Sequence, residues 1–373
     1  FNGVFMASNK MYALHSARIV YTLVQLAFIL VLFECVGPSL EYIGVAYLLS
    51  ACLFTVLIWA VSKRINPDLR YRRHLYDPHL LKEMGGLGMW TILTTIGVLM
   101  FIQTSLVLVN IFLGEHEGGS FALITIMISM TNTTCMTLTT IIAPLLYHQY
   151  ARGDIGTLTA ISKASMRFIG LLMAFPVAYL CIFATQILEL WSKGEFSGST
   201  DILFIMFVVQ IGVCAVSTLE VIPIIYLKIR PVAIATVLFG LINIVGTVLV
   251  LQFTDWGIIG AAAVWTVTML ALNFGYYPLF MSRLLSLKWH TFLKPLVPGY
   301  LAMAACFAVG LTVTHFWTLP TTWAAVLISF SVLFVIYLMV AFTMGLGKED
   351  KKLIMKVMPN VVKKLVARHT AEK

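Results

Sequence analysis

One carboxylic acid stands inside an apolar stretch of this chain, where few side chains can do chemistry. Glu220 lies in "CAVSTLEVIPIIYLKIRP", ten residues before Arg230, which corresponds to about 15 Å along a helix. An ionisable side chain near a bilayer centre costs at least about 2.5–3.5 kcal/mol. Pro223 predicts a kink there because proline removes a backbone hydrogen bond. Glu220 can bind a cation, relay a proton or contact sugar hydroxyls; a protonated or paired structural carboxyl is the alternative.

A cation opens the first apolar run. Arg18 is either an anchor that reaches the membrane surface or a cavity cation that binds a pyrophosphate. Gln25 follows one heptad later and falls on the same helical face. We therefore expect Arg18 and Gln25 to lie in the same surroundings.

Amides and hydroxyls also interrupt the apolar runs. Thr133, Thr137 and Thr140 recur at helical spacing and predict one polar stripe, which either lines a wet cavity or bonds its own helix backbone. The amides either bond between helices or line the same cavity. They are Gln103, Asn110, Asn132, Gln210, Asn243 and Asn273.

Composition shows which elements must position these residues. The chain has 373 residues, of which 60% are hydrophobic and 11% charged, whereas a soluble domain is about 25% charged. Runs of about 20 apolar residues without two-residue alternation predict an all-α polytopic membrane protein. We expect ten spans, near 18–36, 42–62, 86–113, 121–147, 168–191, 201–226, 232–252, 257–280, 294–316 and 323–345.

The distribution of cations predicts the orientation. With residues 1–18 placed in the cytoplasm, 24 of the 25 Lys and Arg residues fall on the cytoplasmic side, and only Lys193 falls opposite. The basic tail 346–373 is then cytoplasmic and can lie on an anionic leaflet. We expect a multi-pass protein of the bacterial inner membrane with a cytoplasmic C-terminus.

Several function classes lack their sequence signatures. The six cysteines are scattered singly, the histidines show no metal-binding spacing, and no phosphate loop is present. We therefore expect no cofactor, no metal, no nucleic-acid partner and no ATP hydrolysis. The chain begins with Phe1 and shows no signal peptide, so we expect it to lack its true N-terminus.

Four segments, in order, resemble the Wzx-type flippases of lipid-linked oligosaccharides, within the multidrug/oligosaccharidyl-lipid/polysaccharide exporter superfamily. The segments are "GVFMASNKMYALHSARI", "GDIGTLTAISKAS", "ILELWSKGEF" and "WGIIGAAAVWTVTM". The resemblance implies that the ten spans correspond to helices 5–14 of a two-lobe 6+6+2 exporter fold. One departure concerns the third span, where Ser105 replaces a frequent Asp and Asn110 a common Gly; a coupling role for that Asp does not transfer.

The resemblance also implies a division of the chain. It assigns the N-lobe remnant to 1–62, a cytoplasmic inter-lobe linker to 63–84, the C-lobe to 85–281, two additional helices to 282–345 and the tail to 346–373. Within the linker region, Asp77 and Pro78 predict the start of a short amphipathic helix. Gly85, Gly86 and Gly88 predict a sharp bend into the next span, and with Pro223 they are the expected hinges.

The implied function is a secondary transporter that flips undecaprenyl-diphosphate-linked oligosaccharide for surface polysaccharide such as O-antigen and lipopolysaccharide. Its expected partners are that substrate, the anionic cytoplasmic leaflet, a polysaccharide polymerase and glycosyltransferases. A multidrug or metabolite exporter of the same fold is the alternative. A membrane enzyme of polysaccharide assembly fits less well, because no large extramembrane loop or clustered His/Asp site is present, and we expect the protein not to be an enzyme.

Overall fold

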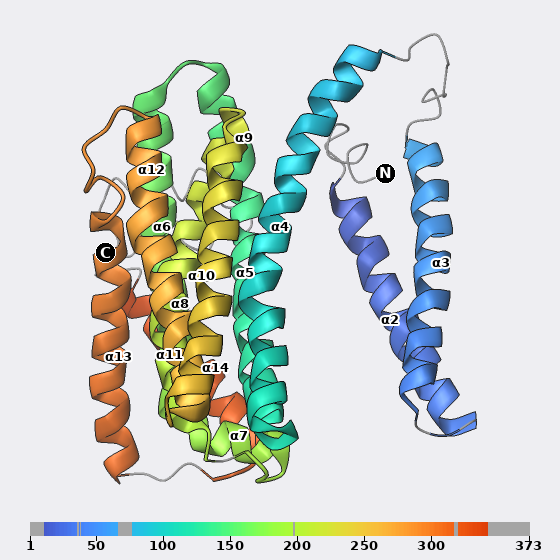
Figure 1. The fold of residues 1–373 in the computed structure, drawn as a ribbon, viewed down its shortest axis with the longest axis vertical. Helices are drawn as coiled ribbons and strands as arrows, with labels where there is room; N and C mark the ends of the chain where they lie inside the picture. The colour runs from blue at the N-terminus through green and yellow to red at the C-terminus, as the bar shows by residue number, and fades with distance from the viewer. Residues whose placement is uncertain are drawn as a thin grey trace, which may run out of the picture. The chain divides into compact units, whose positions relative to one another are not determined.

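Every regular element of the described chain is a helix (Figure 1). The computed structural model describes residues 11–35, 37, 39–65, 77–196, 198–316 and 320–341. The helices are α2 (Met11–Cys35), α3 (Leu40–Ile65), α4 (Pro78–Leu113), α5 (Glu115–Ala151), α6 (Ile155–Ile182), α7 (Ala184–Ser192), α8 (Thr200–Val216), η2 (Ser217–Glu220), α9 (Val221–Ile225), α10 (Ile229–Phe253), α11 (Gly257–Leu270), η3 (Ala271–Tyr276), α12 (Tyr277–Leu284), η4 (Lys294–Leu296), α13 (Val297–Phe316) and α14 (Trp323–Val340). The all-α prediction is confirmed.

The chain forms two compact units. Unit 1 comprises Phe1–Leu81 and unit 2 comprises Lys82–Lys373. The boundary falls within the segment 63–84 that the sequence predicts as a linker, of which residues 66–76 lie outside the described residues, as does the tail 346–373. The further division into lobes and added helices stays a prediction.

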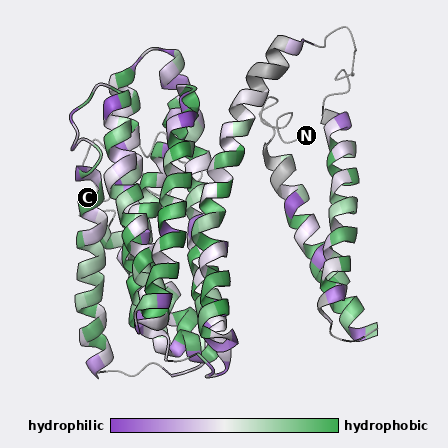
Figure 2. Cartoon of the chain, viewed as in Figure 1, coloured by the Kyte–Doolittle hydropathy of each residue, from purple (hydrophilic) through white to green (hydrophobic). Residues whose placement is uncertain are grey.

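Ten spans are confirmed. Among the described residues, ten helices or runs of successive helices are long and apolar enough to cross a membrane. Figure 2 shows hydrophobic colour along the bodies of these helices and hydrophilic colour mostly near their ends. Within a helix the backbone N–H and C=O groups bond one another except at its two ends, as the interior of a lipid bilayer requires.

The fifth span differs from its predicted bounds of 168–191. It begins at Ile155, because the Asp154 side chain accepts a hydrogen bond from the Thr157 backbone N–H (2.9 Å) and caps the helix. It ends at Ile182, since Phe183 leaves the helical conformation, and α7 follows as a separate helix. Bonding to Thr157 lowers the pKa of the exposed Asp154 carboxyl below its usual value. The cap therefore persists above that lowered pKa and weakens as pH falls through it.

Unit 1 contains an antiparallel pair of helices. Helices α2 and α3 pack through the buried side chains of Ala17 and Ile58. The rings of Tyr21 and Phe54 lie beside them, with centroids 5.1 Å apart. Small side chains at the contact let two apolar helices approach closely in lipid.

Unit 2 is a bundle built around its two most buried spans, α8 and α6. Helix α8 contacts α5, α6 and α11, and α13 packs along α6. Glycines allow two of the close crossings: a Cβ on Gly97 of α4 would lie 2.9 Å from the Thr236 backbone of α10, and one on Gly299 of α13 would lie 3.0 Å from the Gly170 backbone of α6. The hydrophobic effect does not drive helices together in lipid, so van der Waals contacts at these close crossings stabilise the bundle instead.

The expected bend at Gly85, Gly86 and Gly88 is not present. Helix α4 begins at Pro78, the predicted first helical position, and continues without interruption through all three glycines to Leu113. The backbone hydrogen bonds of a long helix outweigh the conformational freedom of glycine, which lowers helix stability by about 1 kcal/mol per residue without forcing a break. A hinge role for these glycines stays a prediction.

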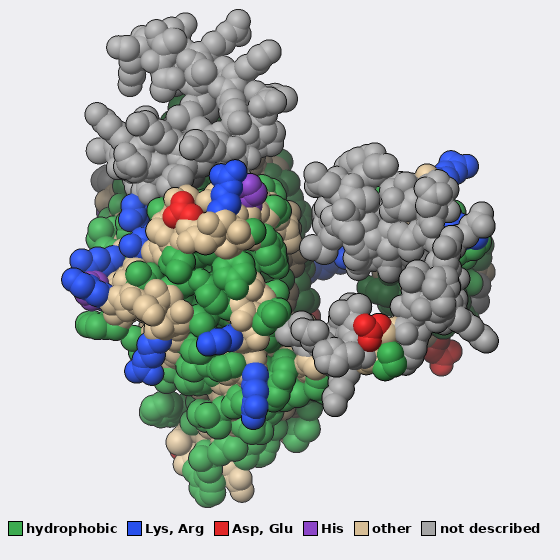
Figure 3. Space-filling model, turned by 90° about the horizontal axis from the view of Figure 1, so that it is seen from above, with side chains coloured by type: hydrophobic (Ala, Val, Ile, Leu, Met, Phe, Trp, Pro, Cys, Tyr) green, Lys and Arg blue, Asp and Glu red, His purple; other side chains and the backbone are tan. Residues whose placement is uncertain are grey.

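The two ends of unit 2 carry opposite charge. We call the turns 151–155, 225–229 and 284–294 the basic end, around which Lys and Arg side chains gather in Figure 3. The opposite end comprises the turns 113–115, 192–200 and 253–257, where Lys193 is the one described cation near several carboxylates. This asymmetry follows the charge distribution from which the sequence predicts orientation.

Candidate functional site

A line of polar side chains runs between α5 and α8. The Gln210 amide of α8 donates a hydrogen bond to Asn132 Oδ1 of α5, and its Nε2 also lies 3.8 Å from Cys214 Sγ. Further along, the hydroxyls of Thr139 and Ser217 are 3.0 Å apart. Gln210 is fully buried, yet its Oε1 has no hydrogen-bond partner among the described residues. A buried amide oxygen without a partner is a place where water or a polar ligand gains a hydrogen bond.

Helical periodicity extends this line to the carboxylic acid. Gln210 and Cys214 of α8 and Ser217, the first residue of η2, share one helical face. Because η2 has three residues per turn, Glu220 lies on the same side as Ser217. We call this set the polar ladder. It comprises Asn132, Cys135 and Thr139 of α5 and Gln210, Cys214, Ser217 and Glu220 of α8 and η2, and the thiol of Cys135 is paired with that of Cys214.

Glu220 lies at a break in its span. The α-helical hydrogen bonding of α8 gives way to the tighter η2 at Ser217–Glu220, and α9 resumes with Pro223 inside it. The missing proline N–H accounts for the interruption, as the sequence predicts. The predicted depth of about 15 Å is too large, because α9 ends at Ile225 and Arg230 belongs to α10. Glu220 lies about 8 Å from the end of its own span, toward the basic end.

The Glu220 carboxyl is half-buried and has no ion-pair or hydrogen-bond partner among the described residues. The buried phenol of Tyr277 on α12 lies within electrostatic range of it and beside Thr236 of α10. A carboxyl without a fixed partner, next to a phenol, can exchange a proton or bind a cation.

A second polar cluster joins three helices and is fully bonded. Asn243 of α10 donates from Nδ2 to Ser105 Oγ of α4 (2.8 Å), and its Oδ1 accepts from Thr268 of α11 (3.2 Å). All three side chains are buried. Ser105, at the position where the resemblance expects Asp, thus forms an inter-helix contact in this chain.

The threonine stripe lies on the surface of unit 2. Thr133, Thr137 and Thr140 are exposed, and their hydroxyls donate to the backbone oxygens of Ser129, Thr133 and Thr137, respectively. Each hydroxyl therefore bonds its own helix backbone, which is the second of the two alternatives, and keeps its lone pairs outward. That the stripe lines a wet cavity stays a prediction.

The surface of unit 2 is uneven in polarity. On α5 the exposed hydroxyls of Ser129 and the threonine stripe alternate with the exposed apolar side chains of Ile126, Met130, Met136 and Ile141, and on α4 the exposed Gln103 lies among mainly apolar side chains. On α10, α13 and α14 the exposed side chains are mainly large and apolar. Examples are Leu238, Leu241, Val245, Leu301, Val309, Leu327, Ile328 and Val332. Lipid suits this apolar surface. The hydroxyl stripe of Ser129, Thr133, Thr137 and Thr140 on α5, which we call the polar face, can also meet water.

The other predicted residues lie apart from the ladder. Asn110 is exposed at the end of α4, and its amide packs against Gly118 at the start of α5. Asn273 is buried in η3 and donates to the Met269 backbone oxygen of its own helix (3.0 Å). In unit 1, Arg18 is exposed and Gln25 is half-buried, both on α2.

Sequence reasoning missed the partners of the ladder. Cys135, Thr139, Cys214, Ser217 and Tyr277 were not singled out. A period of three to four residues in Gln210, Cys214, Ser217 and Glu220 is the signal that predicts a common face. Which face of α5 meets that surface depends on how the helices are rotated against each other, and sequence periodicity does not give this. Within the described residues, no group of three or more His, Cys, Asp or Glu side chains is arranged to hold a metal ion.

Comparison with known proteins supports a membrane protein. The chain is 28% identical over 358 residues to the uncharacterized membrane protein EpsK of Bacillus subtilis (strain 168), and the match covers 94% of this chain and 69% of EpsK. No protein-family model matches the chain, and no solved structure matches it. The similarity and the ten apolar helices identify a multi-pass membrane protein. The resemblance to the Wzx-type flippases stays an interpretation.

Proposed function

We propose that this protein is a secondary transporter that flips undecaprenyl-diphosphate-linked oligosaccharide across the bacterial inner membrane. The observation that carries the proposal is the polar face of α5, which is exposed on a bundle whose other outer helices present apolar side chains. A sugar chain has many hydroxyls and needs hydrogen-bond partners throughout its passage. The lipid tail needs none and can remain in the bilayer.

In this mechanism the polar face of unit 2 lines a water-filled cavity through which the sugar chain passes. The threonine stripe and Gln103 of unit 2 bind sugar hydroxyls in this proposal. Arg18 stays a candidate cation for the diphosphate. Alternating access then exposes the cavity first to one side of the membrane and next to the other.

Glu220 supplies the coupling in this proposal. It binds a proton or another cation in one state and releases it in the other, and the polar ladder beside it transmits the change between α5 and α8. Binding can drive the cycle only if it differs between the two states. A carboxyl at a helix break meets this condition, because the break is where α8 and α9 can change their relative direction.

The basic end of unit 2 faces the cytoplasm in this proposal, and the C-terminus lies on the same side. Substrate is then made by glycosyltransferases on the cytoplasmic face and taken up by a polymerase after export. The protein itself performs no bond-making step.

The polar face is tested by removing its hydroxyls. We expect the triple substitution Thr133→Val, Thr137→Val and Thr140→Val to lower the rate of flipping about tenfold or more, because three hydroxyls that each contribute about 0.5–1.5 kcal/mol are lost. Valine keeps the shape of threonine, so the helix is retained. The measurement is the fraction of a fluorescent lipid-linked oligosaccharide that becomes accessible in proteoliposomes.

The control replaces exposed hydroxyls of the apolar surface, Thr312→Val, Thr314→Val and Ser331→Ala, whose side chains also bond their own helices. This variant should transport normally. Equal rates in the two triple variants would contradict the assignment of the polar face.

A further inference from the structure

A basic pocket lies at the basic end of unit 2, away from the polar ladder. It has a volume of about 280 Å³ and is lined by Lys163 and Arg167 of α6 and by residues of the turn before α13. Those residues are Lys288, His290, Thr291, Lys294 and Pro295. Three lysines and one arginine line it, and none of the described residues that line it is acidic. Such a pocket favours a ligand with concentrated negative charge and several acceptor oxygens, as in a phosphate group.

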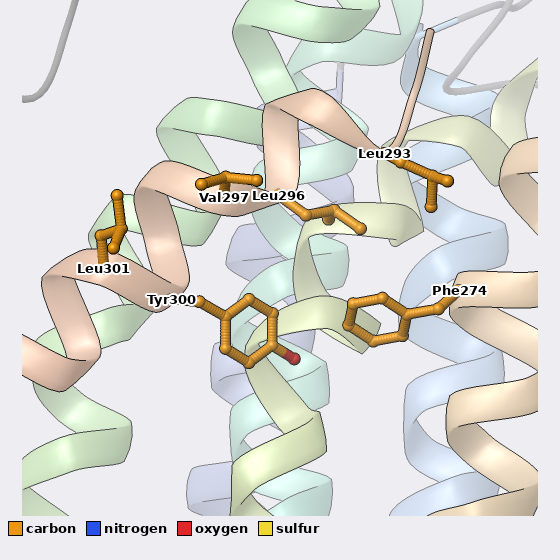
Figure 4. A pocket seen from close by; sticks show the side chains of 6 residues that line it. All are labelled: Phe274, Leu293, Leu296, Val297, Tyr300 and Leu301. Carbon is orange, nitrogen blue, oxygen red and sulfur yellow. The ribbon is translucent and has the colours of Figure 1, made fainter. Parts of the chain in front are cut away.

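An apolar cleft adjoins this pocket across η4. The cleft has a volume of about 330 Å³ and is lined by Phe274, Leu293, Leu296, Val297, Tyr300 and Leu301 (Figure 4). Lys294 and Pro295 line the basic pocket, while their neighbours Leu293 and Leu296 line the cleft, so the two cavities share one turn of chain.

The cleft is apolar and opens to the surface. The Tyr300 hydroxyl accepts a hydrogen bond from the Gly212 backbone N–H (3.2 Å), so its polar atom is bonded to α8. Val297 and Leu301 are mostly exposed, with 53% and 66% of their surface accessible. A chain of methylene groups in the cleft would cover these side chains and make van der Waals contacts with them.

The position of both cavities suits the membrane interface. Trp289, between two lining residues of the basic pocket, is 64% exposed, and its ring lies against that of His290. Exposed tryptophan at the end of a span is typical of the headgroup level. Phosphate and acyl chain are joined at this level in a phospholipid.

We propose that the basic pocket and the apolar cleft together form a binding site for one anionic phospholipid. Its phosphate lies among Lys163, Lys288 and Lys294, and the first part of an acyl chain lies in the cleft beside Phe274 and Tyr300. The bound lipid holds the start of α13 against α6. The site is independent of the transport proposed above, since it shares no residue with the polar face or the ladder.

The test uses the full chain in phosphatidylcholine nanodiscs, titrated with phosphatidylglycerol whose acyl chains are brominated near the headgroup. Bromine quenches nearby tryptophan, and the difference from a Trp289→Phe variant isolates Trp289. We expect half-maximal quenching at a mole fraction about thirtyfold lower than in a Lys163→Gln/Lys294→Gln variant. That ratio corresponds to about 1 kcal/mol for each cation near the membrane surface.

Two controls accompany this variant. Arg152→Gln/Lys228→Gln removes two cations of the same end that lie outside the pocket, and Lys163→Arg/Lys294→Arg keeps the charge; both should bind as the unchanged protein does. Equal quenching by brominated phosphatidylcholine, or unchanged binding in Lys163→Gln/Lys294→Gln, would overturn the proposal. Displacement of the lipid by millimolar inorganic phosphate, or by undecaprenyl diphosphate at a lower mole fraction than phosphatidylglycerol, would also overturn it by assigning the pocket to another phosphate.

Discussion

Replacing Glu220 with Gln at its chromosomal locus is expected to abolish export of surface polysaccharide or to uncouple it from the ion gradient. Glutamine keeps the size of the side chain and removes its ability to exchange a proton. Coupling free energies between sites are typically about 1–3 kcal/mol, so we expect transport to fall about five- to a hundredfold. The variant keeps the break at η2 and Pro223, so any loss of transport comes from the missing carboxyl and not from a changed helix.

The measurement is the amount of surface polysaccharide per cell, with protein abundance determined in the same membranes. Glu189→Gln is the matched control, because Glu189 is an exposed carboxyl at the opposite end of unit 2. We expect this control to export normally. Unchanged polysaccharide in Glu220→Gln cells at normal protein abundance would remove Glu220 from the mechanism.

Replacing Gly97 with Ala is expected to destabilise unit 2, although alanine forms helices better than glycine. The added Cβ would lie 2.9 Å from backbone atoms of Thr236 and Val237, so α4 and α10 would have to separate. Overpacking of this kind lowers the free energy of unfolding by about 1–3 kcal/mol. Gly97→Leu should lower it further.

Gly88→Ala is the matched control on the same helix. A Cβ at Gly88 meets no atom within 4 Å, so the substitution changes only the helix propensity of that position. We therefore expect the free energy of unfolding to rise by up to about 1 kcal/mol. Thermal unfolding midpoints of the purified protein in detergent measure both effects. Equal thermal unfolding midpoints for Gly88→Ala and Gly97→Ala would contradict the close crossing of α4 and α10. A Gly88→Ala protein that is stable but inactive would support the hinge role predicted for Gly88.

The spans could be predicted because hydropathy and length act locally. The ten apolar runs of the sequence correspond to ten spans in the structure. The Lys and Arg residues that occur in every second turn between runs lie together at the basic end of unit 2. The start of the fifth span was missed because Lys163 and Arg167 read as loop residues, whereas long cationic side chains can extend from a helix to the membrane surface. The cap at Asp154 was the available signal.

The candidate site was only partly predictable. Glu220 and Pro223 stand out in an apolar run, and the amides Asn132 and Gln210 were expected to bond between helices, as they do. The ladder itself depends on which faces of α5 and α8 meet, a property of packing in three dimensions. The same holds for the basic pocket, whose lysines come from segments more than 100 residues apart.

Solvent access to α5 tests the central claim most directly. With the six cysteines replaced by alanine, Thr137→Cys and Leu241→Cys place one thiol on the polar face and one on the apolar surface of α10, both at exposed positions. A membrane-impermeant maleimide reacts with thiolate, which forms in water and not in lipid. The account predicts that Thr137→Cys is labelled in native membranes while Leu241→Cys is not. Labelling of neither, or of both at the same rate, would contradict a water-filled path along α5.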